Sequence, residues 1–182
     1  KKKDTSNIYI KIIKRTILIF LLGIFLSLFP KFDFENLRIV GVLQRIAIVY
    51  LVCAIMYLKT SHSTQLKAGI GILIIYWITM AFIPFNGNLA GTLDPGINFA
   101  AWVDSFIVPG RLYQETWDPE GFYSTLPAIV TGISGMLSGR IILDQSNSLK
   151  DKIIKLFSWG AIILVIGSFW DYIFPINKHI WT

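Results

Sequence analysis

The chain has 182 residues, of which 54% are hydrophobic and 15% charged, and its mean hydropathy is +0.60. An average soluble domain carries about 25% charged residues, so this composition argues against a soluble globular fold. The net charge of +6 does not indicate nucleic acid as a partner, because Lys and Arg stand at the ends of apolar runs. The single cysteine, Cys53, lies inside such a run, so we expect neither a disulfide framework nor a cysteine-based metal site.

Five apolar runs predict transmembrane helices, judged against the roughly 20 apolar residues that cross a hydrocarbon core about 30 Å thick. The first run is short and needs an extension toward Ile8, and the second carries Gln44 and Arg45 in its interior. We therefore expect an all-α fold, a polytopic transmembrane helix bundle with about five spans and one long extracytoplasmic loop. The runs cover residues 16–29, 39–58, 68–85, 122–143 and 153–174.

The distribution of Lys and Arg orients these spans, since both residues collect in cytoplasmic loops. Twelve of them flank the first span and the connections 59–67 and 140–155, whereas four lie on the opposite side. We expect the amino-terminal end in the cytoplasm and the loop 86–121 outside it, as for a multi-pass protein of a bacterial inner membrane. Residues 1–182 should form a single transmembrane domain, a fragment of a larger multi-span protein.

The loop 86–121 is longer than the 12 to 15 residues above which connections tend to be functional or disordered. Its apolar content predicts that it folds back on the bundle, with a short interfacial helix over 99–108 that ends at Pro109-Gly110. The string WDPEG, at 117–121, reads as the start of a helix: Asp118 as the cap, Pro119 in the first turn and Glu120 at the positive end of the dipole.

Small residues recur in the fourth run at spacings of three and four, which places them on one face of a helix. Such a face lets a second helix approach closely in lipid. A cofactor groove along the same face is the alternative. The residues are Gly121, Thr125, Ala128, Gly132, Gly135 and Gly139.

Four strings occur in order along the chain: GVLQR at 41–45, WVD with RLY at 102–113, WDPEGFYSTLPAI at 117–129 and PINKHIWT at 175–182. Together they resemble the heparan-alpha-glucosaminide N-acetyltransferase family, including its bacterial relatives, from the second span to the end. The resemblance implies a membrane-embedded N-acetyltransferase. Such an enzyme moves an acetyl group from cytoplasmic acetyl-CoA, its donor, to an amino sugar on the far side of the membrane.

The catalytic residue that the resemblance implies is a histidine in an H-A-x-W-x-G motif, expected upstream of residue 1, so the catalytic residue within this chain is unknown. His62 is expected in a solvated cytoplasmic loop, and His179 is not expected to be the catalyst. The substrate-binding candidates are supporting residues. They are Arg45, Asp104, Asp118, Glu120, Asn177 and Lys178.

Each candidate also has a structural interpretation. Arg45 lies inside a span, where a charge is costly, so we expect it to contact substrate or CoA, or else to pair with an acid such as Asp104 or Asp118 or to snorkel toward the interface. Gln44, its neighbour, should point to a different face. Asn177 and Lys178, near a Trp, are equally typical of membrane anchors.

The partners expected are membrane lipid, acetyl-CoA and a small-molecule sugar, with no nucleic acid and no metal. A homo-oligomer is left open. Two functions from other classes remain: a multi-span transporter or permease, which intramembrane charge and small-residue faces also suit, and a catalytically inactive membrane scaffold.

Overall fold

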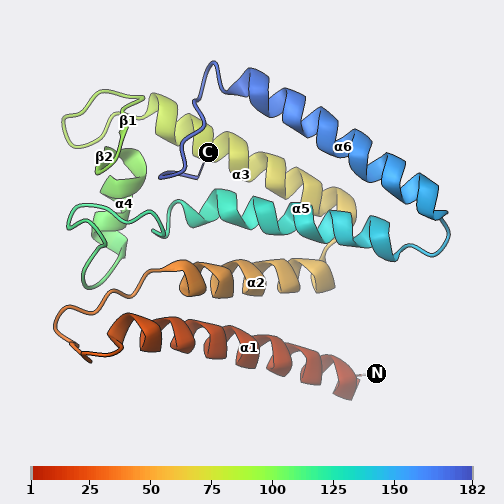
Figure 1. Ribbon diagram of the computed structural model, residues 1–182, viewed down its shortest axis with the longest axis horizontal. Helices are drawn as coiled ribbons and strands as arrows, with labels where there is room; N and C mark the ends of the chain where they lie inside the picture. Colours follow the sequence, from red (N-terminus) through yellow and green to blue (C-terminus); the bar gives the residue numbers. More distant parts are fainter. Residues whose placement is uncertain (1, 182) are drawn as a thin grey trace.

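The computed structural model describes residues 2–181, and their side chains from residue 6 onward. Six helices make up most of the chain, as the apolar runs predicted. The five long helices lie side by side as a bundle, and the short α4 lies at one end (Figure 1). The helices are α1 (Lys2–Leu28), α2 (Val42–Lys59), α3 (His62–Phe82), α4 (Phe99–Ile107), α5 (Thr125–Leu143) and α6 (Leu149–Trp170).

Helix α5 occupies the middle of the bundle, in contact with α2, α3 and α6. Helix α1 packs along α2 on the outside, and α6 forms the opposite edge (Figure 1). No residue of α6 is buried, so most of its apolar surface faces outward. An apolar helix that is exposed in this way is typical of a protein that lies in lipid.

Four helices, α2, α3, α5 and α6, are long and apolar enough to cross a membrane, which confirms the all-α membrane bundle. Helix α1 is not among them. Its apolar part begins at Thr16 and ends at Leu28, and the turns before it carry Lys11, Lys14 and Arg15. The first predicted span is thus the end of a longer, charged helix.

Several helices start a few residues away from the predicted positions, and capping explains the largest shift among the spans. Helix α3 begins at His62 rather than at residue 68, since the Ser61 hydroxyl accepts a hydrogen bond from the Thr64 backbone N–H at 3.3 Å. Only Thr60 and Ser61 separate α2 from α3, so His62 lies in the first turn of a helix, not in a loop. Helix α5 begins at Thr125, after the predicted residue 122.

The long loop is folded, and α4 confirms the short helix that was predicted there. A two-residue antiparallel hairpin, β1 (Leu93–Asp94) with β2 (Ile97–Asn98), precedes α4 and was not predicted. The Asn98 side chain joins both elements. It accepts from the Ala101 N–H at 2.9 Å, which caps α4, and donates to the Asp94 carbonyl at 2.9 Å.

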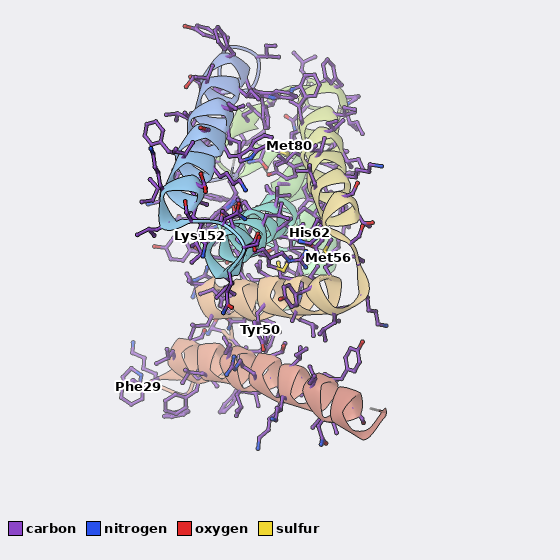
Figure 2. All side chains as sticks on the ribbon, turned by 90° about the vertical axis from the view of Figure 1, so that its right-hand side faces the viewer. Phe29, Tyr50, Met56, His62, Met80 and Lys152 are labelled. Carbon is purple, nitrogen blue, oxygen red and sulfur yellow. The ribbon has the colours of Figure 1, made fainter. Side chains whose placement is uncertain are left out.

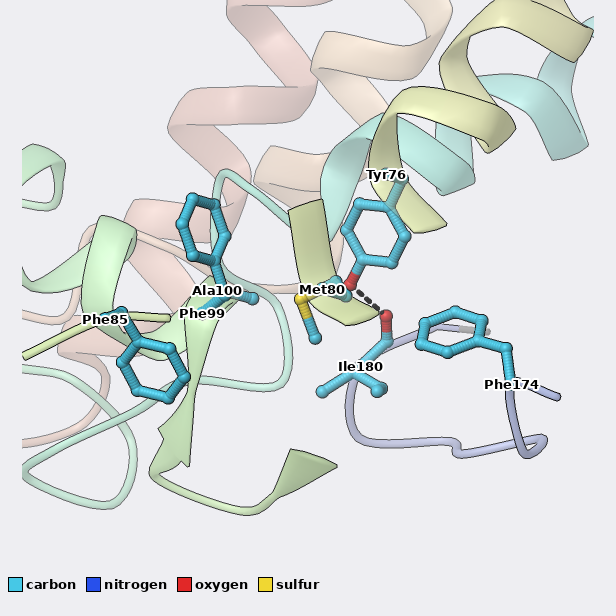
Figure 3. Close-up of a cluster of buried hydrophobic side chains, with 7 residues drawn as sticks. All are labelled: Tyr76, Met80, Phe85, Phe99, Ala100, Phe174 and Ile180. Carbon is cyan, nitrogen blue, oxygen red and sulfur yellow. Dashed lines mark hydrogen bonds between the residues drawn. The ribbon is translucent and has the colours of Figure 1, made fainter. Parts of the chain in front are cut away.

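A hydrophobic cluster ties this loop to α3 and to the C-terminal segment (Figure 3). Within it the Tyr76 hydroxyl donates to the Ile180 carbonyl at 2.5 Å, and the Tyr76 ring stacks on that of Tyr123. The loop and the C-terminal segment therefore cover the same end of the bundle. The cluster consists of Tyr76, Met80, Phe85, Phe99, Ala100, Phe174 and Ile180.

Among the glycines on the small-residue face of α5, Gly132 lies closest to another helix. A Cβ on Gly132 would lie 2.6 Å from Cys53 Sγ and 2.7 Å from Val49 Cγ1, both on α2. At Gly135 and Gly139 a Cβ would meet nothing within 4 Å. Close helix packing accounts for Gly132 but not for the two glycines further along.

We expect Gly132→Ala to lower the free energy of unfolding by about 1–3 kcal/mol, because the added methyl overpacks the contact with Val49. Gly135→Ala is the matched control and should be neutral or stabilising, since alanine favours a helix by up to about 1 kcal/mol. Equilibrium unfolding in mixed detergent micelles measures both. Equal stability of the two variants would contradict the close α2–α5 contact.

Candidate functional site

The segment from Asp118 to Ser124, between the long loop and α5, is bound by two arginines. The first is Arg38, in the connection before α2. Its Nε donates to Asp118 Oδ2 and its Nη2 to Asp118 Oδ1, both at 2.6 Å. The same Nη2 donates to Glu120 Oε2 at 2.5 Å. This two-pronged arrangement is the strong form of an arginine–carboxylate contact.

Asp118 is a buried acceptor and not the cap of α5, so the interpretation of WDPEG as a helix start is wrong. Its side chain is 0% exposed, and it also accepts from the backbone N–H groups of Tyr113, at 3.0 Å, and Glu120, at 2.9 Å. The N-cap position of α5 is Ser124, whose side chain makes no capping bond. The carboxylate folds the turn around itself instead of starting the helix.

Arg38 is positioned by a second chain segment. Its backbone pairs with Gly110 in an antiparallel bridge, and the Arg111 N–H donates to the Leu37 carbonyl at 3.2 Å. Gly110 has φ 85°, and a Cβ there would lie 2.6 Å from the Leu37 oxygen. Only glycine fits this turn, so the loop end after α4 fixes the arginine.

The surroundings of Arg38 act on its pKa in opposite directions. Burial lowers the pKa of the guanidinium, and its contacts with Asp118 and Glu120 outweigh burial, so the pKa is raised above the usual value. Arg38 therefore carries a permanent positive charge. It was absent from the sequence-based candidates because it stands outside the apolar run, where a surface charge is the ordinary interpretation.

Arg45 of α2 binds the same segment from within the bundle and is 6% exposed. Its Nη2 donates to the Pro119 carbonyl at 2.7 Å, to the Gly121 carbonyl at 3.3 Å and to the Ser124 hydroxyl. The guanidinium carbon lies 4.8 Å from the centre of the Trp181 ring. Arg45 is thus held by carbonyls and an aromatic face, and the predicted ion pair with Asp104 or Asp118 is wrong.

The neighbour Gln44 faces a different helix, as predicted. It is 4% exposed and lies against Gly23 of α1, where a Cβ would come within 2.6 Å of its Oε1. Adjacent residues of α2 therefore serve two contacts. Gln44 fixes the distance between α1 and α2, and Arg45 fixes the loop.

Asp104 of α4 is the second buried carboxyl group, 1% exposed. Its Oδ1 accepts from the Tyr123 N–H at 2.9 Å, and Gly121 lies so close that a Cβ there would clash with Oδ2. Burial raises the pKa of Asp104 to about 6, against the opposing hydrogen bonds from the Tyr123 and Phe122 backbone. This carboxyl group can exchange a proton near neutral pH.

Two cavities adjoin these side chains and share Asn98. The smaller, of about 10 Å³, has room for roughly one water molecule, and Asp104, Asp118, Ser124 and His179 line it. The larger, of about 480 Å³, is open and combines amides, hydroxyls and an acid with aromatic faces. That lining suits a small hydroxyl-rich molecule. Its side chains include Phe85, Asn88, Asn98, Trp102, Ser105, Glu115 and Thr116.

The two last candidates lie in the C-terminal segment. The Asn177 side chain donates to the Leu93 carbonyl of β1 at 3.4 Å and accepts from the His179 N–H at 3.0 Å, which fastens the segment to the hairpin. Lys178 is exposed. The ring of His179 meets the Trp117 ring edge-on at 5.2 Å. His179 therefore joins Asp104 and Asp118 at the smaller cavity, a position that its sequence context did not reveal.

Fold and site together define a helical integral membrane protein with a loop-covered acidic cluster at one end of the bundle. No protein-family model matches the chain. It is 25% identical to heparan-alpha-glucosaminide N-acetyltransferase from Homo sapiens, over 82% of this chain and 30% of that protein. It is 23% identical to the Mus musculus protein of the same name, over 94% of this chain and 35% of that protein.

These matches confirm the resemblance: the chain is related, at the level of the family, to the heparan-alpha-glucosaminide N-acetyltransferases. It spans about a third of the length of the curated relatives that it matches.

Arg38 and Asp118 should behave as a coupled pair. We expect Arg38→Gln to lower the free energy of unfolding by about 2 kcal/mol, below the ~3–5 kcal/mol of a fully buried pair because Arg38 is partly exposed. Asp118→Asn should cost a similar amount, and the double variant less than the sum. Arg111→Gln, an exposed arginine in the same loop, is the control and should change stability by less than about 0.5 kcal/mol. Additive losses would contradict the pairing.

Asp104 should make the protein less stable as pH rises. Its pKa in the folded state, about 6, exceeds the ordinary value of 3.8, so the folded protein binds the proton more tightly than the unfolded chain. The contribution of Asp104 to the free energy of unfolding therefore falls between about pH 4 and pH 6 and stays low above that range. Unfolding of Asp104→Asn, measured across this range, should lack the fall.

The exposed Asp33 supplies the control with the opposite sign. Its pKa is lowered by hydrogen bonds from the Asn36 side chain and backbone, so its contribution grows as pH rises through the acidic range. The differences between wild type and each variant should therefore have opposite slopes. Parallel slopes for Asp104→Asn and Asp33→Asn would show that Asp104 titrates as an ordinary surface acid.

Proposed function

We propose that this chain is part of a membrane-embedded acyltransferase that moves an acetyl group from cytoplasmic acetyl-CoA to an amino sugar on the other side of the membrane. The relationship to curated N-acetyltransferases across 94% of the chain is the observation that carries the proposal. The distribution of Lys and Arg predicts that the loop 86–121 lies outside the cytoplasm, so the proposal assigns the acidic cluster to the acceptor side.

The reaction asks for few groups. The amine nitrogen of the sugar attacks the thioester carbonyl carbon, an N–C bond forms, and the C–S bond breaks with its electron pair leaving on the CoA thiolate. The acylated nitrogen then loses a proton to become the amide, and the thiolate takes up a proton to become the CoA thiol. The acceptor nitrogen must attack as a free amine, so the ammonium proton of the bound acceptor first passes to a base. We assign that base to the histidine expected upstream of residue 1. Residues of this chain would hold and orient the acceptor.

Glu120 is the acid best placed to meet an acceptor ammonium. Its side chain is 23% exposed, and one of its oxygens is held by Arg38. Asp118, in contrast, is enclosed, and its two oxygens accept four hydrogen bonds from Arg38 and the backbone. We therefore propose that Glu120 contacts the substrate, whereas Asp118 positions Arg38 and the turn.

The larger cavity gives the acceptor a polar place to bind at the same end of the bundle. Trp102 offers an aromatic face, and Asn88 and Ser105 offer donors and acceptors for hydroxyl groups. These groups are also suited to a transported solute, so the functional test must separate transfer from transport.

Reconstitution of the full-length protein in proteoliposomes, with acetyl-CoA on the side of Lys59 and labelled glucosamine on the side of Leu89, should yield N-acetylated sugar. Unmodified glucosamine that reaches the side of Lys59 would indicate a transporter instead. The absence of both N-acetylated product and glucosamine uptake would indicate an inactive scaffold.

In this assay Glu120→Gln should lower kcat/KM at least about tenfold, which corresponds to roughly 1.4 kcal/mol of transition-state stabilisation, while the protein stays folded. Glu35→Gln is the matched control, because Glu35 is an exposed acid in the α1–α2 connection at the same end of the bundle. Equal rates for wild type and Glu120→Gln would place the acceptor elsewhere.

The side of the membrane on which the cluster lies can be tested directly. In a Cys53→Ala background, Leu89→Cys should react with an impermeant thiol reagent in intact cells, and Ser63→Cys only after the membrane is opened. Leu89 is 83% exposed and Ser63 is exposed, so neither substitution disturbs packing. The reversed pattern would overturn the orientation derived from Lys and Arg.

A further inference from the structure

Helix α1 carries three cations in its middle that are not needed for any contact within the acidic cluster. Lys11, Lys14 and Arg15 are spaced by three and four residues, so they share one face, and all three are exposed. Among residues 6–181, whose side chains the structure describes, every ion pair involves Arg38. These three positive charges therefore have no carboxylate partner in that part of the chain.

The cations line a cleft between α1 and α2 with a volume of about 440 Å³. Tyr50 of α2 forms its other side, and Figure 2 shows this residue between the two helices. The guanidinium carbon of Arg15 lies 5.7 Å from the centre of the Tyr50 ring. The tyrosine hydroxyl and the three cations give the cleft four side chains that can donate hydrogen bonds.

The cleft lies where α1 becomes apolar, because the three cations directly precede the apolar part that begins at Thr16. On its other side, Tyr50 belongs to α2, which is long and apolar enough to span the membrane. Cations beside such a segment reach toward the interface or acquire a counter-charge. A phosphate group would supply that counter-charge and accept hydrogen bonds from lysine and arginine together.

The apolar surface next to the cleft favours one source of phosphate. On the same face of α1, Leu18, Leu22 and Phe25 follow Arg15 at spacings of three and four, and they are 58%, 50% and 48% exposed. Ile12 and Leu18 line the cleft itself. A charged head beside a continuous apolar stripe matches a lipid and not a soluble phosphate.

We propose that the cleft between α1 and α2 binds the headgroup phosphate of an anionic phospholipid, with the acyl chains along Leu18, Leu22 and Phe25. Basic pockets between transmembrane helices on the cytoplasmic side are suited to anionic headgroups. The lipid fills the space between a charged outer helix and the bundle. It fixes α1 against α2, and through Gln44 and Gly23 it supports the helix that also carries Arg45. This site is independent of the proposed acetyl transfer.

Native mass spectrometry of the full-length protein tests the proposal. In mixed micelles with equal amounts of phosphatidylglycerol and phosphatidylcholine, the wild-type protein should retain phosphatidylglycerol preferentially. The triple variant K11Q/K14Q/R15Q should lose that preference by about tenfold or more. The triple variant K150Q/K152Q/K155Q, which removes the same charge from α6, should keep it.

Three outcomes would overturn the proposal. The first is equal retention of the two lipids by the wild-type protein, a measurement that needs no variant to fold. The second is an unchanged preference in K11Q/K14Q/R15Q. The third is displacement of phosphatidylglycerol by inorganic phosphate or coenzyme A added in solution, which would assign the cleft to a soluble phosphate.

Discussion

The guanidinium groups of Arg38 and Arg45 bind the turn at 118–124 from two sides. The rest of the loop-covered end of the bundle depends on these hydrogen bonds. Arg38 donates hydrogen bonds to the carboxylates of the turn, and Arg45 donates hydrogen bonds to its backbone carbonyls. A backbone that runs through a buried place must satisfy its polar groups, and here side chains from another segment do so. Without the two arginines, the buried carboxylate of Asp118 would keep only the N–H groups of Tyr113 and Glu120, and the carbonyls of Pro119 and Gly121 would keep only hydroxyl donors.

The arginine contacts also explain why the C-terminal segment belongs to the site. Trp181 covers the guanidinium of Arg45, and the carbonyl of Ile180 takes the hydroxyl of Tyr76 (Figure 3). Both contacts hold the C-terminal segment against the end of the bundle where the turn lies, and electrostatic interactions are stronger where side chains replace water. Burial raises the pKa of Asp104 to about 6, and the residues around its carboxyl group include Gly121 and Tyr123 of the turn and His179 of the C-terminal segment, which lines the same small cavity.

The sequence predicted what depends on local composition. Hydropathy located the four spanning helices, and the Pro109-Gly110 turn located the end of α4, because both signals act over a few neighbouring residues. It did not predict which acid pairs with which arginine. Asp118 fits the pattern of a helix cap as well as that of a buried acceptor. Only Arg38, which lies 80 positions away, distinguishes the two.

The starts of the helices and the extent of the first span were predicted only in part. Ser61 and the His62 turn look like a polar loop until the capping bond to Thr64 is known, so the start of α3 was placed too late. In the same way the apolar end of α1 looks like a short span, although its helix continues through Lys14 and Lys11. Hydrophobicity fixes where a helix can lie in lipid, whereas capping and packing fix where it ends.

The balance of charge in the cluster connects its structure to the proposed chemistry. Asp104, Asp118 and Glu120 face two arginines, so the cluster carries one net negative charge when Asp104 is ionised and none when it is protonated. An acceptor that enters as an ammonium ion would restore neutrality with Asp104 ionised, and its charge would lower the pKa of that carboxyl group. Binding of the cation and release of a proton from Asp104 are then linked. Under the proposed function, the buried carboxyl group therefore favours a cationic acceptor over a neutral sugar of the same shape, since only the cation compensates the charge that burial makes costly.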